Sequence, residues 1–250
     1  MFNEEVKNAV EKSSCICFSY DTTGSMRSAI GHVRQNLKSL AETMFKDMPS
    51  LKMAFVGHGD YCDGDRCITM LDFTNDLDKI MSFIQDTPDT SGGDQPECYE
   101  LVLNRVQQLS WPEEGGTLVM IGDADPHDVN YPENTDHLDW RKELATLKSK
   151  KINVFALQCL QRLNGTKFWS EMAELSGTPL LILEDAADFQ NATDLLGGLA
   201  YTAGGSVADT DEYVGGAVLR TCGLSANATE NYRKLASYKR TTETTGDSTK

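Results

Sequence analysis

Apolar residues follow two alternating patterns along the chain. Short, nearly continuous apolar runs are typical of buried strands, whereas segments with an apolar residue every third or fourth position are typical of helices. The runs predict strands at 15–20, 53–56, 67–71, 117–121, 152–157 and 180–183. The periodic segments predict helices at 3–13, 25–48, 76–85, 94–109, 138–149, 167–175 and 185–203. Strands that alternate with helices in this way predict a doubly wound α/β fold, with a mostly parallel central sheet flanked by helices.

Several predicted helices begin with a recognisable start signal. Asp76 and Asp185 each precede an apolar-periodic segment, as N-capping residues do. Asp94 is followed three residues later by Glu97, a spacing typical of a capping box, so Asp94 is predicted to cap the helix that follows it. Ser25 is a candidate cap for the helix after the first strand.

The polar loop 57–66 joins two short strands that are expected to form a hairpin-like pair. The loop region is rich in groups that can bind metals, namely His58, Asp60, Cys62, Asp63, Asp65 and Cys67. A second metal site in this loop is one interpretation, but the spacings match neither an EF-hand loop nor a close pair of cysteines. The favoured prediction is a solvated acidic turn.

The regular pattern weakens after residue 203. Two glycine pairs follow, and the end of the chain from about Lys239 is rich in Thr, Ser and Lys. Such composition is typical of loose chain ends. The α/β domain is therefore predicted to span residues 13–203, and residues 204–250 to form a C-terminal extension with a flexible tail.

Composition and charge narrow the range of functions. A chain of 250 residues with 40% hydrophobic residues is long enough to bury one large core. The formal net charge of −15 disfavours nucleic acid as a partner and suits a protein that binds cations. No stretch approaches the roughly 20 apolar residues that span a bilayer, and the acidic N-terminus lacks the apolar core of a secretory signal. We therefore expect no membrane association, a cytoplasmic location and reduced thiols at the seven cysteines.

The clearest candidate for chemistry follows the first strand. Asp21, Thr23 and Ser25 lie two residues apart in a turn between a predicted strand and a predicted helix. In a parallel α/β sheet such a turn lies at the carboxyl end of a strand, where ligands bind. A carboxylate and two hydroxyls are hard oxygen donors, which favour Mg²⁺ or Mn²⁺.

The segment Asp21-Thr22-Thr23-Gly24-Ser25 resembles the first metal-binding motif, DxSxS, of the von Willebrand factor type A (vWA) family. Two further segments fit the same family in order and separation across residues 13–200. Residues 91–97 (SGGDQPE) occupy the place of the second loop, and residues 121–124 (IGDA) match the third, with Asp123 after a core strand. The chain is most similar to intracellular and α-kinase-associated members. It departs from the family at Asp94, where a Thr is usual; Thr90 is the alternative donor.

The resemblance implies a Rossmann-like vWA fold with a metal-ion-dependent adhesion site. It assigns Mg²⁺ or Mn²⁺ to a ligand set drawn from all three loops, listed as Asp21, Thr23, Ser25, Asp94 and Asp123. Such a cation keeps one position for a carboxylate of a partner protein, so the resemblance implies a non-catalytic interaction module in a multiprotein complex. Asp125 and His127 lie in the third loop, where they either support the site or belong to a solvated loop.

A different class of function remains as the alternative. Haloacid-dehalogenase-like phosphatases also place an Asp at the end of the first strand of a doubly wound sheet and depend on Mg²⁺. They usually carry a second Asp two residues later as an acid/base, and this chain has Thr23 there. A dinucleotide-binding protein is disfavoured because the first turn lacks the G-x-G-x-x-G pattern. The sequence does not choose between Asp94 and Thr90, and it does not identify the partner, an open/closed switch or the oligomeric state.

Overall fold

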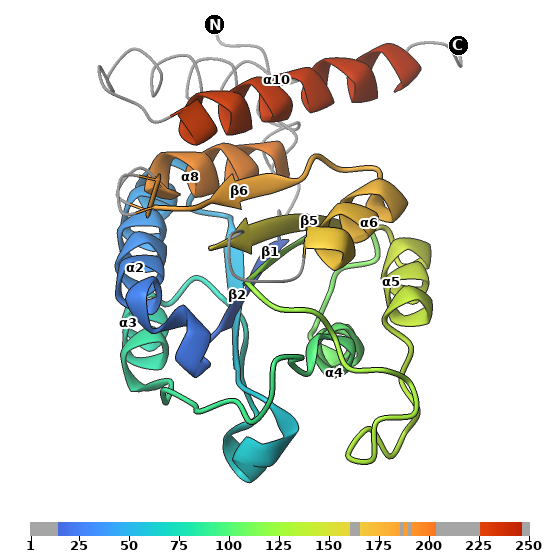
Figure 1. Cartoon of the computed structure of the whole chain (residues 1–250). Helices are drawn as coiled ribbons and strands as arrows, with labels where there is room; N and C mark the ends of the chain where they lie inside the picture. The colour runs from blue at the N-terminus through green and yellow to red at the C-terminus, as the bar shows by residue number, and fades with distance from the viewer. Residues whose placement is uncertain (1–14, 161–165, 186–187, 190–191, 204–225, 247–250) are drawn as a thin grey trace, which may run out of the picture.

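The computed structural model describes residues 15–160, 166–185, 188–189, 192–203 and 226–246. Within them, six strands form one sheet in the order β3-β2-β1-β4-β5-β6 (Figure 1). The strands are β1 (Cys15–Asp21), β2 (Lys52–His58), β3 (Ile68–Thr74), β4 (Gly116–Gly122), β5 (Ile152–Cys159) and β6 (Leu181–Leu183). Strand β3 pairs antiparallel with β2, and the other neighbours pair in parallel. The predicted doubly wound α/β fold and the hairpin-like pair β2–β3 are therefore confirmed.

Side chains of the central strand β1 alternate between two cores. Ile16, Phe18 and Tyr20 belong to one hydrophobic cluster, and Cys17 belongs to the other. Because successive side chains of a strand point to opposite faces, a strand covered on both faces needs apolar residues at nearly every position. This explains why β1 reads as a continuous apolar run in the sequence.

Helices cover both faces of the sheet (Figure 1). Helices α2 (Ile30–Asp47), α3 (Leu77–Asp86) and α8 (Ala192–Ala203) contribute buried residues to the core that contains Phe18. Helices α4 (Tyr99–Arg105), α5 (Trp140–Ser149) and α6 (Thr166–Ser176) contribute to the opposite core. Three short 3₁₀ segments complete this part of the chain: η1 (Gly24–Ser28), η2 (Tyr61–Arg66) and η3 (Val106–Gln108).

Two of the predicted helix starts are wrong. Ser25 lies inside η1, and α2 begins at Ile30 with no side-chain cap. Asp94 caps no helix either, because α4 begins at Tyr99 with Cys98 as its N-cap. Glu97 instead donates its backbone N–H to the carbonyl of Asp125 (2.8 Å), which ties residues 94–97 to the third loop. Tertiary pairing has overridden the local start signal at both places.

The other two predicted caps accept backbone hydrogen bonds. Asp76 accepts from Lys79 N (3.2 Å) at the start of α3, as predicted. Asp185 Oδ1 accepts from Asp188 N (2.9 Å), ahead of α8.

A long helix, α10 (Ala226–Gly246), follows the described part of the α/β domain. It crosses one end of the molecule beside α8 and β6 (Figure 1). Tyr232 and Leu235 are buried in the main core, and the Asn231 side chain bonds both the N–H and the carbonyl of Ile182. The chain from Lys239 to Gly246 is therefore helical, which corrects the prediction of a loose tail there. The predicted helix 3–13 and residues 204–225 lie outside the described residues, and the domain boundary at 203 stays a prediction.

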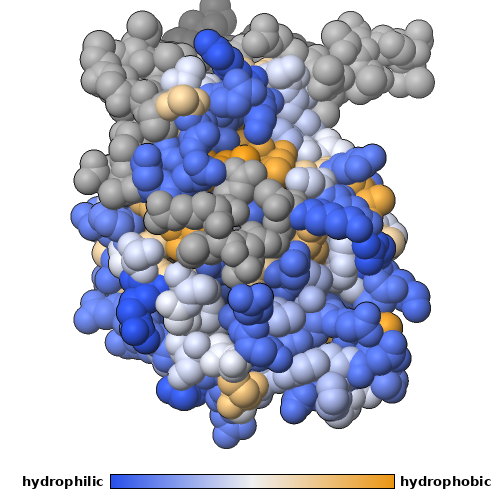
Figure 2. All heavy atoms as spheres, in the orientation of Figure 1, coloured by the Kyte–Doolittle hydropathy of each residue, from blue (hydrophilic) through white to orange (hydrophobic). Residues whose placement is uncertain are grey.

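The viewed surface is mainly hydrophilic (Figure 2). Among the described residues, no helix combines the length and the apolar character needed to cross a bilayer.

Candidate metal centre

Two predicted loops meet at the carboxyl edge of the sheet. Asp21 ends β1, and Asp123 directly follows β4. These strands are parallel neighbours, and the winding of the sheet reverses between them, because β2 lies on one side of β1 and β4 on the other. Ligands of doubly wound sheets bind at such a switch point.

A chain of hydrogen bonds connects four of the five predicted ligands. Asp21 Oδ1 accepts from Thr23 N (2.8 Å) and from Thr23 Oγ1 (2.6 Å). Thr23 Oγ1 lies 3.2 Å from Ser25 Oγ, which donates to Asp123 Oδ1 at 2.9 Å. The two loops therefore present neighbouring carboxylate and hydroxyl oxygens. We refer to these four residues as the Asp21 network.

Tyr99, at the start of α4, links the same two loops from the protein interior. Its hydroxyl is fully buried, donates to Asp21 Oδ2 (2.6 Å), and accepts from Asp123 N (3.2 Å) and Ala124 N (3.3 Å). Gly122 is required beside it, because a Cβ at that position would lie 2.3 Å from the Tyr99 hydroxyl. Sequence reasoning missed Tyr99, which looks like an ordinary core position of a helix.

Glu97 places a third carboxylate beside the Asp21 network. It is buried, and within the described part of the chain its Oε2 has no hydrogen-bond partner. A Cβ on Gly92 would lie 2.8 Å from Glu97 Oε1 and 3.4 Å from Thr23 Cβ, so the glutamate and the threonine meet across this glycine. Gly92 has a φ of +62°, which also favours glycine. Sequence reasoning assigned Glu97 to a capping box, and its role here had no local signal.

Asp94 is the predicted ligand that stands apart. Its half-exposed carboxylate lies 3.9 Å from His127 Nε2, and among the described residues no hydrogen bond joins it to the Asp21 network. Asp94 does line a cleft of about 270 Å³ together with Ser25, Gly92 and Glu97. The alternative donor, Thr90, bonds Thr22 through both its hydroxyl (2.9 Å) and its backbone N–H (3.0 Å), so it fastens the second loop to the first.

Burial and mutual repulsion raise the pKa values of the carboxyl groups. Burial raises the pKa of Asp123 to about 6 and that of Glu97 to about 10, and the charge of Asp21 adds to both shifts. The pKa of Asp21 is also raised, chiefly by burial, although hydrogen bonds from Thr23 and Tyr99 oppose the shift. Asp123 Oδ2 is buried and has no hydrogen-bond partner among the residues with described positions. Unpartnered oxygens and crowded carboxylates fit a hard divalent cation, which would favour their ionised forms.

The acidic loop 57–66 is not the solvated turn that the sequence predicts. Asp60 and Asp63 are buried. Asp63 accepts from Asp60 N (3.0 Å), Ser91 N (3.0 Å) and Gly92 N (3.4 Å), so its carboxylate joins this loop to the second one. Sequence spacing could not show the link to the second loop, because Ser91 and Gly92 lie about thirty residues further along the chain than Asp63.

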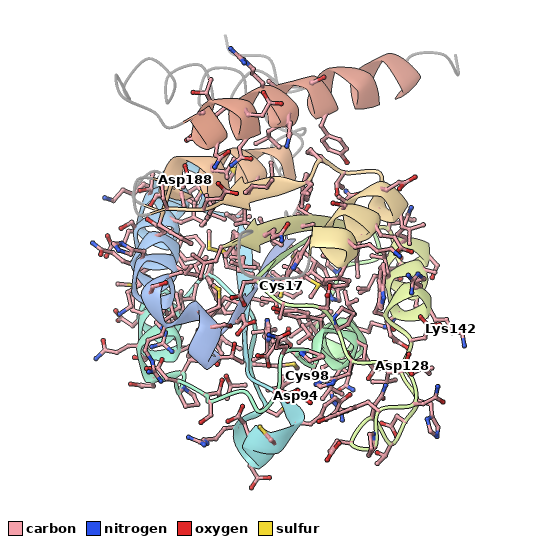
Figure 3. All side chains as sticks on the ribbon, viewed as in Figure 1. Cys17, Asp94, Cys98, Asp128, Lys142 and Asp188 are labelled. Carbon is pink, nitrogen blue, oxygen red and sulfur yellow. The ribbon has the colours of Figure 1, made fainter. Side chains whose placement is uncertain are left out.

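Asp60 also forms a cluster with His127 and Asp94. His127 Nε2 lies 2.7 Å from Asp60 Oδ1, and one ligand atom from each of the three residues lies within 4.8 Å of the others. This cluster of two carboxylates and an imidazole could hold a metal ion. Asp94 is labelled in Figure 3, where it lies near Cys98 at the start of α4. Asp125, by contrast, is exposed.

Comparisons with known proteins bear on the fold. No family model and no curated protein matches the chain. Solved structures do match. One is the pilus adhesin SpaC from Lactobacillus rhamnosus GG, with a TM-score of 0.60 and 14% identity over 77% of this chain and 31% of that one. Another is the conserved hypothetical protein BatB from Bacteroides thetaiotaomicron, with a TM-score of 0.57 and 12% identity over 77% of this chain and 100% of that one. Proximal thread matrix protein 1 from the mussel byssus also matches (TM-score 0.55, 15% identity, 75% and 48%).

These likenesses establish a shared α/β fold. The chain spans about a third of the pilus adhesin and about half of the byssus protein.

Proposed function

We propose that the chain is a vWA-like interaction module that binds Mg²⁺ or Mn²⁺ and uses the ion to dock a carboxylate of a partner protein. The observation that carries this proposal is the hydrogen-bonded chain Asp21–Thr23–Ser25–Asp123 at the switch point of the sheet. These four residues would hold the cation. The bound ion would supply the positive charge that an otherwise anionic surface lacks.

The protein's own residues prepare this site. Tyr99 holds Asp21 and the backbone of the third loop in one arrangement, so the oxygens need little reordering. Ser25 is exposed and lines the cleft, which gives a partner's side chain access to the network from solvent. Glu97 lies against Thr23, and its unpartnered oxygen makes it a better candidate than Asp94 for the acidic group of the second loop.

A non-catalytic role in a multiprotein complex fits the same features. One protein with a similar fold is described as a pilus adhesin, and adhesion is a protein-interaction activity. The residue two positions after Asp21 is Thr23, whose hydroxyl donates to Asp21 and is no substitute for the carboxylic acid of a phosphatase.

The proposal is tested by thermal melting of the metal-free protein with and without Mg²⁺. A ligand at 100 times its Kd stabilises by about 2.7 kcal/mol, so we expect a Tm increase of about 5–10 °C. Ser25→Ala removes an exposed hydroxyl from the network and is expected to abolish most of this increase. Ser28→Ala, an exposed serine of the same 3₁₀ segment, is the matched control and should behave like the unaltered protein.

The same pair of variants tests partner docking. Proteins captured in Mg²⁺ but not in EDTA should be lost with Ser25→Ala and kept with Ser28→Ala. A metal-dependent Tm shift that both variants retain equally would contradict the proposed ligand set. Turnover of a generic phosphate ester that disappears with Asp21→Ala would contradict the non-catalytic role.

A further inference from the structure

Asp60 and His127 form a buried pair outside the Asp21 network. Both side chains are only 1% exposed, and Asp60 Oδ1 lies 2.7 Å from His127 Nε2. The imidazole is fixed in place: its ring stacks on the Tyr131 ring with centroids 3.8 Å apart, and the Tyr61 ring packs against it with centroids 5.5 Å apart. The backbone N–H of His127 donates to Glu100 Oε2 (3.1 Å). A histidine held this firmly presents Nε2 in one direction.

The second oxygen of Asp60 lacks a partner. Asp60 Oδ2 is buried and accepts no hydrogen bond from any residue that the structure describes. It faces the second loop, because a Cβ on Gly93 would lie 3.8 Å from it, and Asp94 is the next residue. A simple ion pair with His127 would leave this buried oxygen unsatisfied, which destabilises a charged group in the protein interior. A cation between Asp60, Asp94 and His127 would satisfy it.

The surroundings carry excess negative charge. Asp60, Asp63, Asp94 and Glu100 all lie around His127 or in the loop that packs on it. Burial by itself lowers the pKa of His127, but the hydrogen bond to Asp60 and the charges of Asp60, Glu100 and Asp94 outweigh it, so the pKa is raised. Within the described residues the other cationic group at this cluster is Arg66, 3.9 Å from Asp63. Four acidic side chains therefore surround one imidazole, and the guanidinium of Arg66 is more than half exposed.

We infer that Asp60, Asp94 and His127 form a second cation site, selective for a transition-metal dication such as Zn²⁺ and separate from the Asp21 network. An imidazole nitrogen with two carboxylates suits Zn²⁺, whereas Mg²⁺ prefers oxygen ligands alone. Tetrahedral Zn²⁺ with ligands at about 2.0–2.2 Å places neighbouring ligand atoms about 3.3–3.6 Å apart. The separations of 2.7 Å to Asp60 and 3.9 Å to Asp94 lie on either side of that range.

The half-exposed position of Asp94 allows the site to close on an ion. Its carboxylate is 50% exposed, whereas the other two ligands are buried, so Asp94 is the ligand best able to move toward an ion. Asp94 belongs to the loop that also carries Glu97 against Thr23. Zn²⁺ at this site would therefore fix the loop that borders the cleft beside Ser25.

Zinc titration of the full chain tests the inference. Metal is removed with EDTA, the protein is desalted, and Zn²⁺ is titrated against a chromophoric chelator with Mg²⁺ in excess to occupy the Asp21 network. We expect one tight equivalent in the unaltered protein. Asp94→Asn and His127→Asn should weaken it by more than about 100-fold, since even changes outside the ligand shell cost about 10–100-fold.

Controls separate ligand loss from unfolding and from the other site. His137→Asn removes an exposed histidine from the same loop region and should bind Zn²⁺ like the unaltered protein. Asp94→Asn changes a half-exposed residue and should keep the circular dichroism spectrum, so the test stands even if His127→Asn unfolds. In the Co²⁺-substituted protein, visible absorption should require His127.

Two results would overturn the inference. One is unchanged Zn²⁺ affinity in a folded Asp94→Asn protein. The other is loss of Zn²⁺ binding with Ser25→Ala but not with Asp94→Asn, which would place the ion at the Asp21 network. The two ligand sets share no residue, so the two proposals can fail separately. If the protein binds Zn²⁺ but Mg²⁺ gives no Tm shift, the proposed function is contradicted and the Zn²⁺ site is supported.

Discussion

Tyr99 connects the two halves of the candidate site through a single buried hydroxyl. It donates to Asp21 and accepts from the backbone of the third loop, so it fixes the distance between the ends of β1 and β4. Such a residue shapes a metal site without touching the ion, because it limits where the ligand carboxylate can turn.

Tyr99→Phe is expected to lower the free energy of unfolding by about 1–3 kcal/mol, because buried polar groups lose their partner. It should also weaken Mg²⁺ binding by about 10–100-fold. Urea unfolding and Mg²⁺-dependent melting measure the two effects. The control is Tyr20→Phe, another buried tyrosine whose hydroxyl donates to Thr87 Oγ1 (2.9 Å), away from the network. It should lose stability and keep Mg²⁺ affinity; equal Mg²⁺ affinity in both variants would contradict the role of Tyr99.

At the residue scale, the sequence indicated that four polar residues lie at the ends of two strands, because the apolar pattern reveals where those strands end. These residues are Asp21, Thr23, Ser25 and Asp123. Glu97 was assigned to a helix start, and Asp60 to solvent. Both contact residues that are far away in sequence: Glu97 lies against Thr23, and Asp60 lies against His127. No local pattern encodes such meetings.

At the scale of elements, the strands and most helices were predictable from apolar periodicity, since each must bury one face or both. The exceptions are the segments that build the candidate sites. Loops 57–66 and 91–97 pack on each other through Asp63, and Glu97 pairs with residues 125–126 instead of lying in the first turn of a helix. Long-range hydrogen bonds there replace the local ones that the capping signals predict.

Helix α10 is the element whose importance the sequence understated. Its buried residues join the main core through α8 and β6, so we expect it to stabilise the α/β domain. Leu235→Ala should lower the free energy of unfolding by about 2–5 kcal/mol, as large-to-small core changes do. Arg233→Ala on the exposed side of the helix is the control and should change it by less than about 1 kcal/mol. Equal, small effects in urea unfolding would mean that α10 contributes little to the domain.

The whole molecule carries a net charge of −15 and gathers much of its buried negative charge at one edge of the sheet. The viewed surface is mainly hydrophilic (Figure 2). A cation at the carboxyl edge would therefore relieve repulsion at the place where solvent screens it least.

This predicts how stability depends on pH without metal. The folded-state pKa of Glu97 is raised to about 10 and that of Glu100 to about 7, both chiefly by burial, so the folded protein holds protons that the unfolded chain has released. Stability must then fall as pH rises from 6.5 to 8, by about 1.4 kcal/mol per pH unit for each proton retained. Burial lowers the pKa of His58 to about 3, so this residue makes stability increase with pH. That contribution is confined to pH values below its unfolded pKa of about 6.5, outside this window.

Urea unfolding at several pH values in EDTA measures this slope. Glu97→Gln should flatten it, and saturating Mg²⁺ should reduce it, because the cation favours ionised carboxylates. If the free energy of unfolding in EDTA instead increased as the pH rose from 6.5 to 8, the result would contradict the buried, crowded arrangement of these groups.

The sequence alone determined the order of strands and helices, the two-sided core and the motif at Asp21, because periodic burial and strand-end turns are local properties. The tertiary structure decided which polar groups share a site: Glu97 with Thr23, Tyr99 with Asp21, and Asp60 with Asp94 and His127. The physical reason is that burial cost and charge repulsion depend on which distant segments meet at the edge of the sheet. Spacing along the chain carries no record of that.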